Sequence, residues 1–446
     1  MIMLVKFLFL ISFFFSVAAW SVSSQLSYEF RDSINQPVNK NGVKNWLSVD
    51  VKSKKPKKRN DGYFEAGARY FHTTDMFMYS APEAYFIREN STNRLIFGRK
   101  IIDWNKYEQF WGLNHINAQR SYDLLDDKPE GPVGIFYEQT LWDHLTTSLF
   151  LSYVYIPQLN PSIRVKDGKI TSPSDSVVYP SKVEISEGHI IPIAYDLNQP
   201  KWSEVVFQKS LGFNLAYDYN NFLFSTYALY KPENKLRINA RRSMNQLYPS
   251  DVAGVTAQPF VNYHGVYGLL AGYQNLYTHN FLGVEVIDAN TELDNIFKSI
   301  DPLKVEPQQR PVKKDEFDIR PSYIAQTYFH YTTIIPRDTF SISLNYIRLL
   351  SKESIQKDSF FQEASRFIDA VGIGGDLSFT DHFSTLIKWY YDFKRQDNIV
   401  KTEIGWHNKS YGLMLGLEVL RSPDTESYWS NFRTNDSVYS KFSIVF

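Results

Sequence analysis

The chain has 446 residues, with 48 Lys and Arg against 48 Asp and Glu, and therefore no formal net charge. This balance argues against binding to nucleic acid through bulk charge. The chain contains no Cys, which excludes a thiol nucleophile, a Cys-ligated metal and a disulfide framework. Aromatic residues make up 16% of the chain, yet the mean hydropathy is −0.33. This composition excludes a membrane protein built from several apolar helices of roughly 20 residues.

Residues 1–19 have the pattern of a cleaved secretory signal peptide. Lys6 supplies a positive charge, Phe7 to Phe15 form a short apolar core, and the small residues Val17-Ala18-Ala19 offer a cleavage site. A single anchor helix is the alternative, but its apolar stretch would be short and is soon followed by serines. We therefore expect an exported protein in which residues 20–446 form one domain.

Most of the remaining chain alternates between apolar and polar residues with a period of two. One example carries Phe383, Thr385, Ile387, Trp389, Tyr391 and Phe393 on one face, and Ser384, Leu386, Lys388, Tyr390, Asp392 and Lys394 on the other. Such alternation predicts a strand between two different media. Several segments, such as 383–395 and 339–350, reach the length of about 9–11 residues that a tilted strand needs to cross a bilayer.

The connections between these segments alternate between short and long. The expected long connections span residues 103–132, 157–208, 290–321, 351–363 and 422–436. Outer-membrane barrels join their strands by tight periplasmic turns and longer outer loops. The pattern predicts an all-β fold, a transmembrane antiparallel up-and-down β-barrel of about 18–20 strands, with 18 preferred. Residues 243–251 form an awkward connection, rather long for a periplasmic turn. The weak alternation of the first 90 residues leaves the strand number open.

The last segment ends in Val438, Ser440, Phe442, Ile444 and Phe446 on one face. This pattern resembles the C-terminal assembly signal of bacterial outer-membrane β-barrels, in which a terminal Phe follows alternating apolar residues. Ser440 departs from that pattern. The resemblance implies insertion by the barrel-assembly machinery into the outer membrane of a Gram-negative bacterium, in contact with its lipid and lipopolysaccharide. The resemblance indicates an architecture but does not identify a transported solute.

A second likeness lies at Gly98-Arg99-Lys100-Ile101-Ile102-Asp103-Trp104 and Trp111-Gly112-Leu113-Asn114. This pattern resembles the strand-to-loop element of alginate-export-like and other substrate-specific porins. It implies loop aromatics beside a solute path, with Trp104, Tyr107 and Trp111 as candidates. These three residues also have the spacing of a helix, and a short amphipathic helix packed in the barrel mouth is the simpler interpretation.

Charged residues at polar strand positions are the candidates for a solute path, because water-facing side chains set selectivity in a barrel. They are Glu65, Arg69, Arg99, Arg237, Arg241, Lys388, Asp392, Lys401, Glu403 and Glu418. Arg237 and Arg241 are expected on one wall, as part of a basic ladder for carboxylated solutes. The alternative is that these charges only pair across neighbouring strands. Both positively and negatively charged residues occur among these candidates, so the sequence does not indicate whether the channel prefers anions or cations.

We expect a porin or channel for small hydrophilic solutes, either sugars or organic anions. The alternative is a non-transporting surface barrel whose outer loops bind exported polysaccharide or a partner. Enzyme activity is not expected, because the nine His residues show no spacing typical of a catalytic or metal site. We expect no cofactor, no metal and no nucleic acid. The basic run Lys54 to Arg59 is expected in a solvated periplasmic turn.

Overall fold

The computed structural model describes the strands of one large sheet and parts of the connections between them. The described residues are 22–34, 43–54, 60–72, 75–105, 107–119, 125, 128–158, 164–172, 183–186, 189–244, 253–289, 325–351, 365–424, 427–432 and 435–446. For a few of them, including residues 239–244, only the backbone is described. The expected signal peptide, the loop 290–321 and most of the loop 351–363 lie outside these residues.

Eighteen strands form the large sheet, and each is 7 to 14 residues long. They are β1 (Val22–Ser33), β2 (Val43–Ser53), β3 (Asn60–Phe71), β4 (Met76–Glu89), β5 (Asn93–Arg99), β8 (Val133–Trp142), β9 (Leu145–Ser152), β14 (Ser210–Tyr219), β15 (Phe222–Pro232), β18 (Tyr263–Gln274), β19 (His279–Ala289), β20 (Gln326–Pro336), β21 (Phe340–Leu349), β22 (Asp369–Ser378), β23 (Phe383–Asp392), β24 (Asn398–His407), β25 (Tyr411–Arg421) and β26 (Ser437–Val445). Each strand pairs with its neighbours antiparallel, in chain order.

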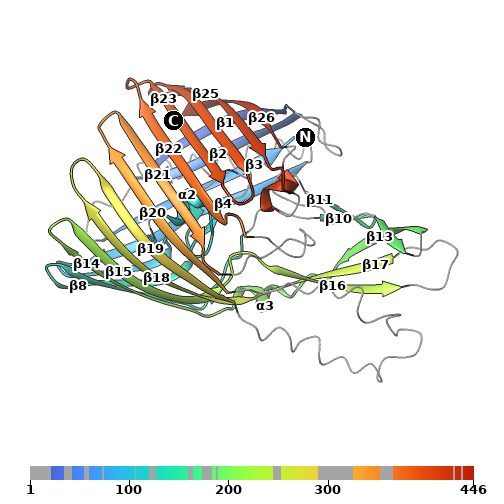
Figure 1. The fold of residues 1–446 in the computed structure, drawn as a ribbon, viewed down its shortest axis with the longest axis horizontal. Coiled ribbons are helices and arrows are strands. Elements are labelled where there is room, and N and C mark those ends of the chain that lie inside the picture. The colour runs from blue at the N-terminus through green and yellow to red at the C-terminus, as the bar shows by residue number, and fades with distance from the viewer. Residues whose placement is uncertain are drawn as a thin grey trace.

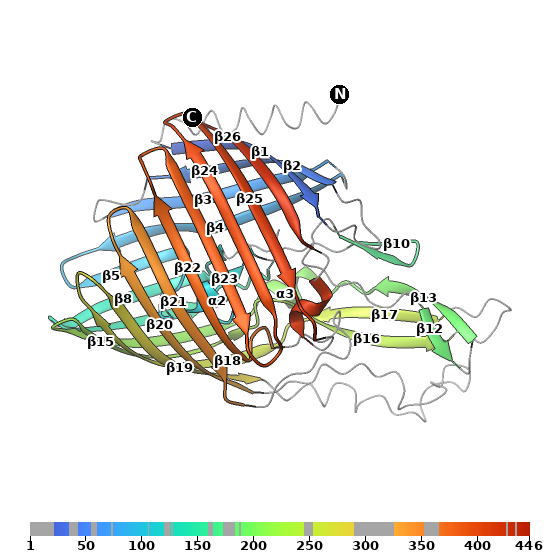
Figure 2. The ribbon, with the colours of Figure 1, turned by 45° about the horizontal axis from the view of Figure 1, so that its top comes forward.

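The sheet closes on itself, because β1 pairs antiparallel with β26 from Gln25↔Val445 to Ser33↔Ser437. Figure 2 shows these first and last strands side by side at the seam of the barrel. Closure leaves no sheet edge, which is the condition for a β-structure to sit in lipid. The predicted antiparallel barrel and the preferred number of 18 strands are confirmed.

Side chains alternate between the two faces of the wall as the sequence pattern predicts. On β25 the outward positions Leu413, Leu415 and Leu417 are exposed, whereas the inward Glu418 and Leu420 are buried. Exposed aromatic and aliphatic residues such as Phe213 and Leu344 continue this outward face around the barrel. A contiguous apolar belt of this kind is the lipid-facing surface of a membrane barrel.

Tight connections gather at one end of the barrel and long ones at the other (Figure 1). The turn between β14 and β15 consists of Asn220 and Asn221, with φ of 47° and 73°. Asn tolerates this left-handed conformation, and two such residues in sequence suit the twist of a hairpin. We call this end the turn side and the opposite end the loop side. The basic run at 54–59 joins β2 to β3 on the turn side, although residues 55–59 lie outside the described part.

Two alternating strands lie outside the barrel wall. A barrel of 20 strands would have placed them in the membrane. The connection from β15 to β18 carries β16 (Arg237–Met244) and β17 (Ala253–Phe260), which form a hairpin. β17 also pairs in parallel with β13 (His189–Leu197), which pairs with β12 (Val183–Ser186). This four-stranded extension projects from the loop side (Figures 1 and 2). The awkward connection at 243–251 therefore joins the two strands of an outer hairpin, although residues 245–252 lie outside the described part.

Shorter elements occupy the remaining described connections. They are α2 (Glu108–Trp111), β6 (Ala118–Gln119), β7 (Pro129–Glu130), β10 (Arg164–Lys166), β11 (Lys169–Thr171), α3 (Trp202–Val206) and the 3-10 helix η3 (Tyr428–Phe432). The region 157–208, expected to be a structureless loop or plug, thus contains strands and a helical turn. No helix in the described part of the chain is both long and apolar enough to cross a bilayer.

Candidate functional site

The connection from β5 to β8, residues 100–132, folds back into the lumen of the barrel, and we call it the inward loop. Its residues Tyr107, Trp111 and Ile116 are almost completely buried. They belong to one apolar cluster with inward side chains of β4 to β9 and of β15 to β25, including Val266 and Ile347. The inward loop therefore packs into a cluster that extends along most of the wall, whereas β26, β1, β2 and β3 carry no member of it.

Glycines on the wall leave room for the aromatic side chains of the inward loop. A Cβ added at Gly283 of β19 would lie 2.6 Å from Tyr107 Cε1, and one at Gly372 of β22 would lie 2.5 Å from Phe110 Cε1. A Cβ added at Gly212 of β14 would lie 2.8 Å from the ring of Trp104. Separations below about 3 Å do not occur between a real Cβ and its neighbours, so larger residues at these positions would displace the loop.

Buried polar contacts attach the inward loop to β15 and β19. Glu285 of β19 accepts hydrogen bonds from Asn105 Nδ2 and Tyr227 Oη, both at 2.6 Å. His115 Nδ1 lies 2.8 Å from the other carboxylate oxygen of Glu285. A buried carboxylate with three partners, two of them on the inward loop, is an expensive contact to break. Glu285 was not a candidate in the sequence, although its inward position follows from the strand alternation.

Glu108 stabilises the shape of the loop from within. It is buried, and its carboxylate accepts a 2.5 Å hydrogen bond from the Ile116 amide. Burial, together with the nearby carboxylate of Glu285, raises the pKa of Glu108 to about 7. This carboxyl group therefore changes charge near neutral pH while the loop is docked.

The helix expected from Trp104, Tyr107 and Trp111 is only one turn long. α2 covers Glu108–Trp111 and ends at Gly112, whose φ of 60° suits glycine. Tyr107 and Trp111 are about 1% exposed, so they anchor the loop and present no surface to a solute. Trp104 packs against Tyr227, with ring centroids 6.4 Å apart.

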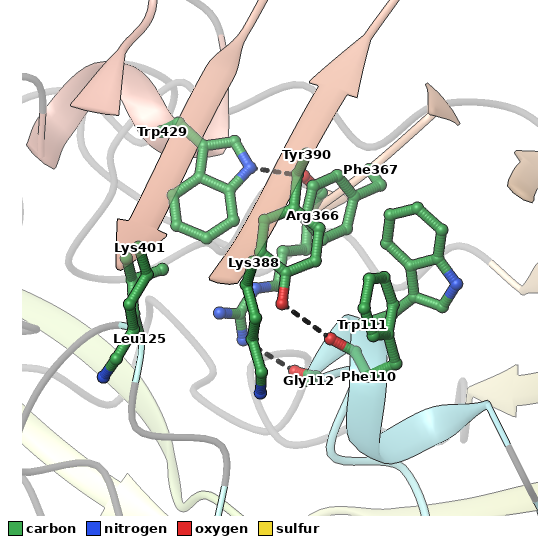
Figure 3. Close-up of a pocket in the computed structure, with 10 residues that line it drawn as sticks. All are labelled: Phe110, Trp111, Gly112, Leu125, Arg366, Phe367, Lys388, Tyr390, Lys401 and Trp429. Atoms are coloured by element: carbon green, nitrogen blue, oxygen red, sulfur yellow. Dashed lines mark hydrogen bonds between the residues drawn. The ribbon is translucent and has the colours of Figure 1, made fainter. Parts of the chain in front are cut away.

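A pocket lies between the end of α2, the loop 365–368, η3 and the wall strands β23 and β24 (Figure 3). Its lining residues are Phe110, Trp111, Gly112, Leu125, Arg366, Phe367, Lys388, Tyr390, Lys401 and Trp429. Two of the hydrogen bonds drawn in Figure 3 fix the end of the helix, from Tyr390 Oη to the Phe110 carbonyl at 3.0 Å and from Arg366 to the Gly112 carbonyl at 2.6 Å.

Among the described residues that line this pocket, three are cations, Arg366, Lys388 and Lys401. Lys388 and Lys401 stand directly opposite each other on β23 and β24. Figure 3 shows both side chains extending toward the segment that carries Gly112 and Leu125. Like charges that face each other across two strands destabilise a sheet. On the far side, Lys401 lies 3.1 Å from Glu418 and 3.3 Å from Glu403.

A polar network extends from β24 and β25, at the edge of the apolar cluster, to β26 and β1, which carry no member of it. Arg31 of β1 reaches Glu418 of β25 at 2.9 Å, with both side chains buried. Tyr439 donates a 2.7 Å hydrogen bond to Glu403. The structure thus brings together the sequence candidates Lys388, Lys401, Glu403 and Glu418. The sequence analysis missed Arg31 and Arg366.

Two further inward candidates lie on β3, which carries no member of the apolar cluster. Glu65 lies 3.3 Å from Lys52, and both side chains are partly exposed. Arg69 is buried against Trp46, with its guanidinium carbon 5.9 Å from the ring centre.

The other charged candidates lie away from this network. Asp392 accepts the Ile368 amide at 2.8 Å and shapes the end of β23. Arg99 follows Gly98, whose φ of 124° interrupts the extended strand, and it pairs with Glu130 at 3.1 Å. Arg237 and Arg241 lie on β16 in the extension, outside the barrel wall where the basic ladder was expected.

The terminal residues of the assembly-signal pattern lie on the lipid side of the last strand. Phe442 and Phe446 are exposed on the outward face of β26 and just after it. Ile444 shares their outward position, and it pairs with Tyr411 of β25 and Leu26 of β1.

A closed barrel with an apolar outer belt and a polar interior is the architecture of proteins in the outer membrane of Gram-negative bacteria. A scan against protein-family models finds no match, and a search of curated proteins finds none. Within the described residues, no group of three or more His, Cys, Asp or Glu could hold a metal ion.

Several solved structures are similar to this chain at low sequence identity. OccAB3 of Acinetobacter baumannii is 10% identical, with 95% of this chain and 98% of that chain covered and a TM-score of 0.47. OccK11 (OpdR) of Pseudomonas aeruginosa is 9% identical over 96% and 94% of the two chains, with a TM-score of 0.44. Salmonella typhi OmpF is 8% identical over 95% and 97%, with a TM-score of 0.40. At this level of similarity, these structures assign neither a family nor a function to the chain.

Proposed function

We propose that the protein is a passive diffusion channel for small hydrophilic solutes, with a preference for organic anions over sugars. The observation that carries this proposal is the inward loop, which packs inside an 18-stranded barrel while the strands from β24 through β26 and β1 to β3 carry charged inward side chains. Barrels of about 16–18 strands are wide enough for an aqueous channel. A loop docked on one side would narrow that channel and give it a wall of defined chemistry.

Water-accessible charges support a path along β24 to β26 and β1 to β3. The side chains of Lys52 and Glu65, on β2 and β3, are 50% and 31% exposed although they face inward. The Glu403 side chain on β24 is 20% exposed. Charged groups stay hydrated inside a barrel only where water reaches them. The solute path is therefore proposed between these strands and the inward loop.

The preference for anions is proposed from the basic pocket beside the loop. Arg366, Lys388 and Lys401 bring three positive charges together among aromatic rings. A carboxylate entering there would relieve the repulsion between the facing lysines, and apolar parts of the solute would contact the rings. Arg366 suits this role because its planar guanidinium binds a carboxylate through two parallel hydrogen bonds.

Single-channel recording in planar bilayers tests both parts of the proposal. We expect stepwise conductance, a reversal potential in a KCl gradient that shows anion preference, and block by millimolar organic carboxylates. Lys388→Glu should shift the reversal potential toward cations, whereas Lys409→Glu, in the exposed turn between β24 and β25, should leave it unchanged. Absence of conductance from correctly folded barrels would reject the channel. Block by neutral sugars and not by carboxylates would reject the anion preference.

The four-stranded extension favours a second candidate function, binding of a partner at the cell surface. β12, β13, β16 and β17 project beyond the barrel on the loop side. Replacing residues 236–261 by a short turn removes the β16–β17 hairpin without touching the barrel sheet. If the extension serves a surface partner, this deletion should leave conductance intact and abolish the retention of surface polysaccharide or protein by the purified barrel. If conductance is lost and no ligand is retained by the intact protein, the surface role is wrong.

A further inference from the structure

Two segments of the chain leave the barrel wall to form the four-stranded extension. One is the connection from β9 to β14, which carries β12 and β13, and the other is the connection from β15 to β18, which carries β16 and β17. Both segments are bound by Glu233 and Asn234, the two residues that follow β15. We call this pair the junction. Each of its residues is 8% exposed, so its contacts are buried.

The junction holds the base of the extension. The Glu233 carboxylate accepts hydrogen bonds from Arg237 Nε, at the start of β16, and from Asn262 Nδ2, just before β18, the latter at 2.7 Å. The Asn234 carbonyl accepts the amide of Gln158, in the connection from β9, at 2.7 Å. The junction therefore joins both segments that lead to the extension.

The junction also binds the inward loop. The side-chain amide of Asn234 donates to the Asn114 carbonyl at 2.5 Å, and its side-chain oxygen accepts from Lys231 Nζ at 2.5 Å. Asn114 has a φ of 61°, a left-handed conformation that persists only where surrounding contacts hold it. The next residue, His115, lies against Glu285 of β19. Asn234 thus fixes the part of the loop that docks on β19.

A buried cation links the loop to the junction. Lys231 of β15 is 3% exposed and also donates to the Pro232 carbonyl at 3.0 Å. The carboxylates of Glu108, on the inward loop, and Glu233, in the junction, lie close enough to attract its charge. A buried charge that loses a partner is strongly unfavourable. Moving the junction away from Lys231 therefore also disturbs the contact with the loop.

We propose that the extension regulates the proposed channel by holding or releasing the inward loop. The junction binds both parts, and its buried hydrogen bonds and charges are costly to leave unpaired. The base of the extension and the docked segment of the loop therefore move together. A macromolecule that binds the extension and displaces its base releases the loop and raises the conductance. The inference rests on the channel function and goes beyond it, since it assigns a regulatory role to the extension.

Hydrogen exchange of the inward loop in the folded, full-length barrel measures this coupling. The amides of Leu113 and Ile116 are hydrogen-bonded within the loop, so they exchange when the loop opens. Asn234→Ala should speed their exchange about tenfold, because it removes buried hydrogen bonds. Asn214→Ala is the matched control and should leave the exchange unchanged, since this buried Asn binds Ser225 of the neighbouring wall strand.

Arg237→Gln tests the path from the extension to the loop. Arg237 lies on β16 and binds the junction through Glu233. This change should speed exchange of the loop severalfold, and adding it to Asn234→Ala should have no further effect, because both act through the junction. Lys169→Gln, at an exposed position in the connection that carries β12 and β13, should have no effect. The inference is overturned if Arg237→Gln exchanges as the wild type does, or if the two effects simply add.

A probe attached to the extension tests regulation of the conductance. The chain contains no Cys, so Gln258→Cys, at an exposed position of β17, is selectively biotinylated. Streptavidin added on the loop side should then raise the single-channel conductance, and Asn234→Ala should abolish this response. Ile34→Cys, 54% exposed at the loop-side end of β1, controls for obstruction by streptavidin itself. Equal responses at the two positions would contradict the regulatory role.

Two checks separate this inference from other failures. Slow migration of the unheated protein in SDS gels shows that each variant is folded. If the channel proposal is wrong, folded barrels will not conduct with or without streptavidin. The effect of Arg237→Gln on hydrogen exchange does not require conductance, so it decides the coupling between extension and loop in either case.

Discussion

The ring of Tyr107 lies flat on the imidazole of His330, with ring centroids 3.7 Å apart and an interplanar angle of 14°. Both residues are almost completely buried. Tyr107 also fills the space that the missing side chain of Gly283 leaves on the neighbouring strand. The position of the inward loop is thus set by ring stacking and by small residues of the wall, and not by the loop backbone alone.

Gly372→Val should displace the inward loop. The new Cβ would lie 2.5 Å from Phe110 Cε1, and overpacking of this kind weakens a contact by about 1–3 kcal/mol. We expect a larger and less steady single-channel conductance, while the barrel itself stays folded. Gly375→Val on the same strand is the control, because a Cβ there has no atom within 4 Å. Identical conductance of the two variants would show that Phe110 does not hold the loop.

Docking of the inward loop should depend on pH. The pKa of Glu108 is about 7 in the docked loop, because the group is buried near Glu285, and it returns to its ordinary value of 4.5 when the loop is released. A carboxyl group with a raised pKa binds its proton more tightly in the docked state. Docking should therefore strengthen as the pH falls from above 7 toward 4.5. We expect steadier and smaller conductance at pH 5.5 than at pH 8.

Glu108→Gln isolates this effect from the other ionisable groups beside it. His115, Lys231 and Glu285 lie close to Glu108 and remain in the variant. The amide oxygen of Gln still accepts the Ile116 amide, so the loop keeps its shape. Conductance of the variant should vary less between pH 5.5 and pH 8 than that of the wild type. An unchanged pH dependence would assign the effect to another group.

Glu418→Gln should destabilise the seam of the barrel. Glu418 lies between Arg31 at 2.9 Å and Lys401 at 3.1 Å, and its side chain is 2% exposed. Removing one partner of a buried ion pair costs about 3–5 kcal/mol. Urea unfolding in lipid vesicles measures this loss. Glu89→Gln, which removes one partner of the exposed pair with Arg94, should cost only about 0–1 kcal/mol.

Ile387→Arg tests which face of the wall meets lipid. Ile387 faces outward on β23, and its neighbour Lys388 lines the basic pocket. An arginine facing lipid near the middle of the bilayer should reduce the folding free energy by about 2–4 kcal/mol. Lys388→Gln should leave the folding free energy unchanged within error. Equal losses in vesicle unfolding experiments would contradict the assigned faces.

The barrel was predictable because alternation is a local property of each strand. The segment 383–393 shows its inward and outward positions without any knowledge of its neighbours. The same property does not distinguish strands of the wall from strands outside it. β16 and β17 are also strands, but they pair with β13 outside the membrane. Whether a strand belongs to the wall or to the extension depends on its pairing with distant segments, which the sequence does not show. For this reason the sequence analysis assigned Arg237 of β16 to the wall.

The inward loop was only partly predictable. Its aromatic residues were identified, but their partners Gly283 and Gly372 lie about 180 and 260 residues further along the chain. Glycines at inward positions were a usable signal, since a packed wall normally carries larger side chains. The one-turn length of α2 reflects tertiary packing of Tyr107 and Trp111, which outweighs the helical spacing of the sequence.

The pairing of β1 with β26 has a consequence for how the protein is made. Ser24 and Phe446 exchange backbone hydrogen bonds of 3.3 and 2.9 Å across the seam. Until the last strand arrives, β1 and β25 each present a row of unsatisfied amides and carbonyls, which attract other chains. An export intermediate that lacks its final segment therefore needs protection from aggregation for as long as its opposite edges remain apart.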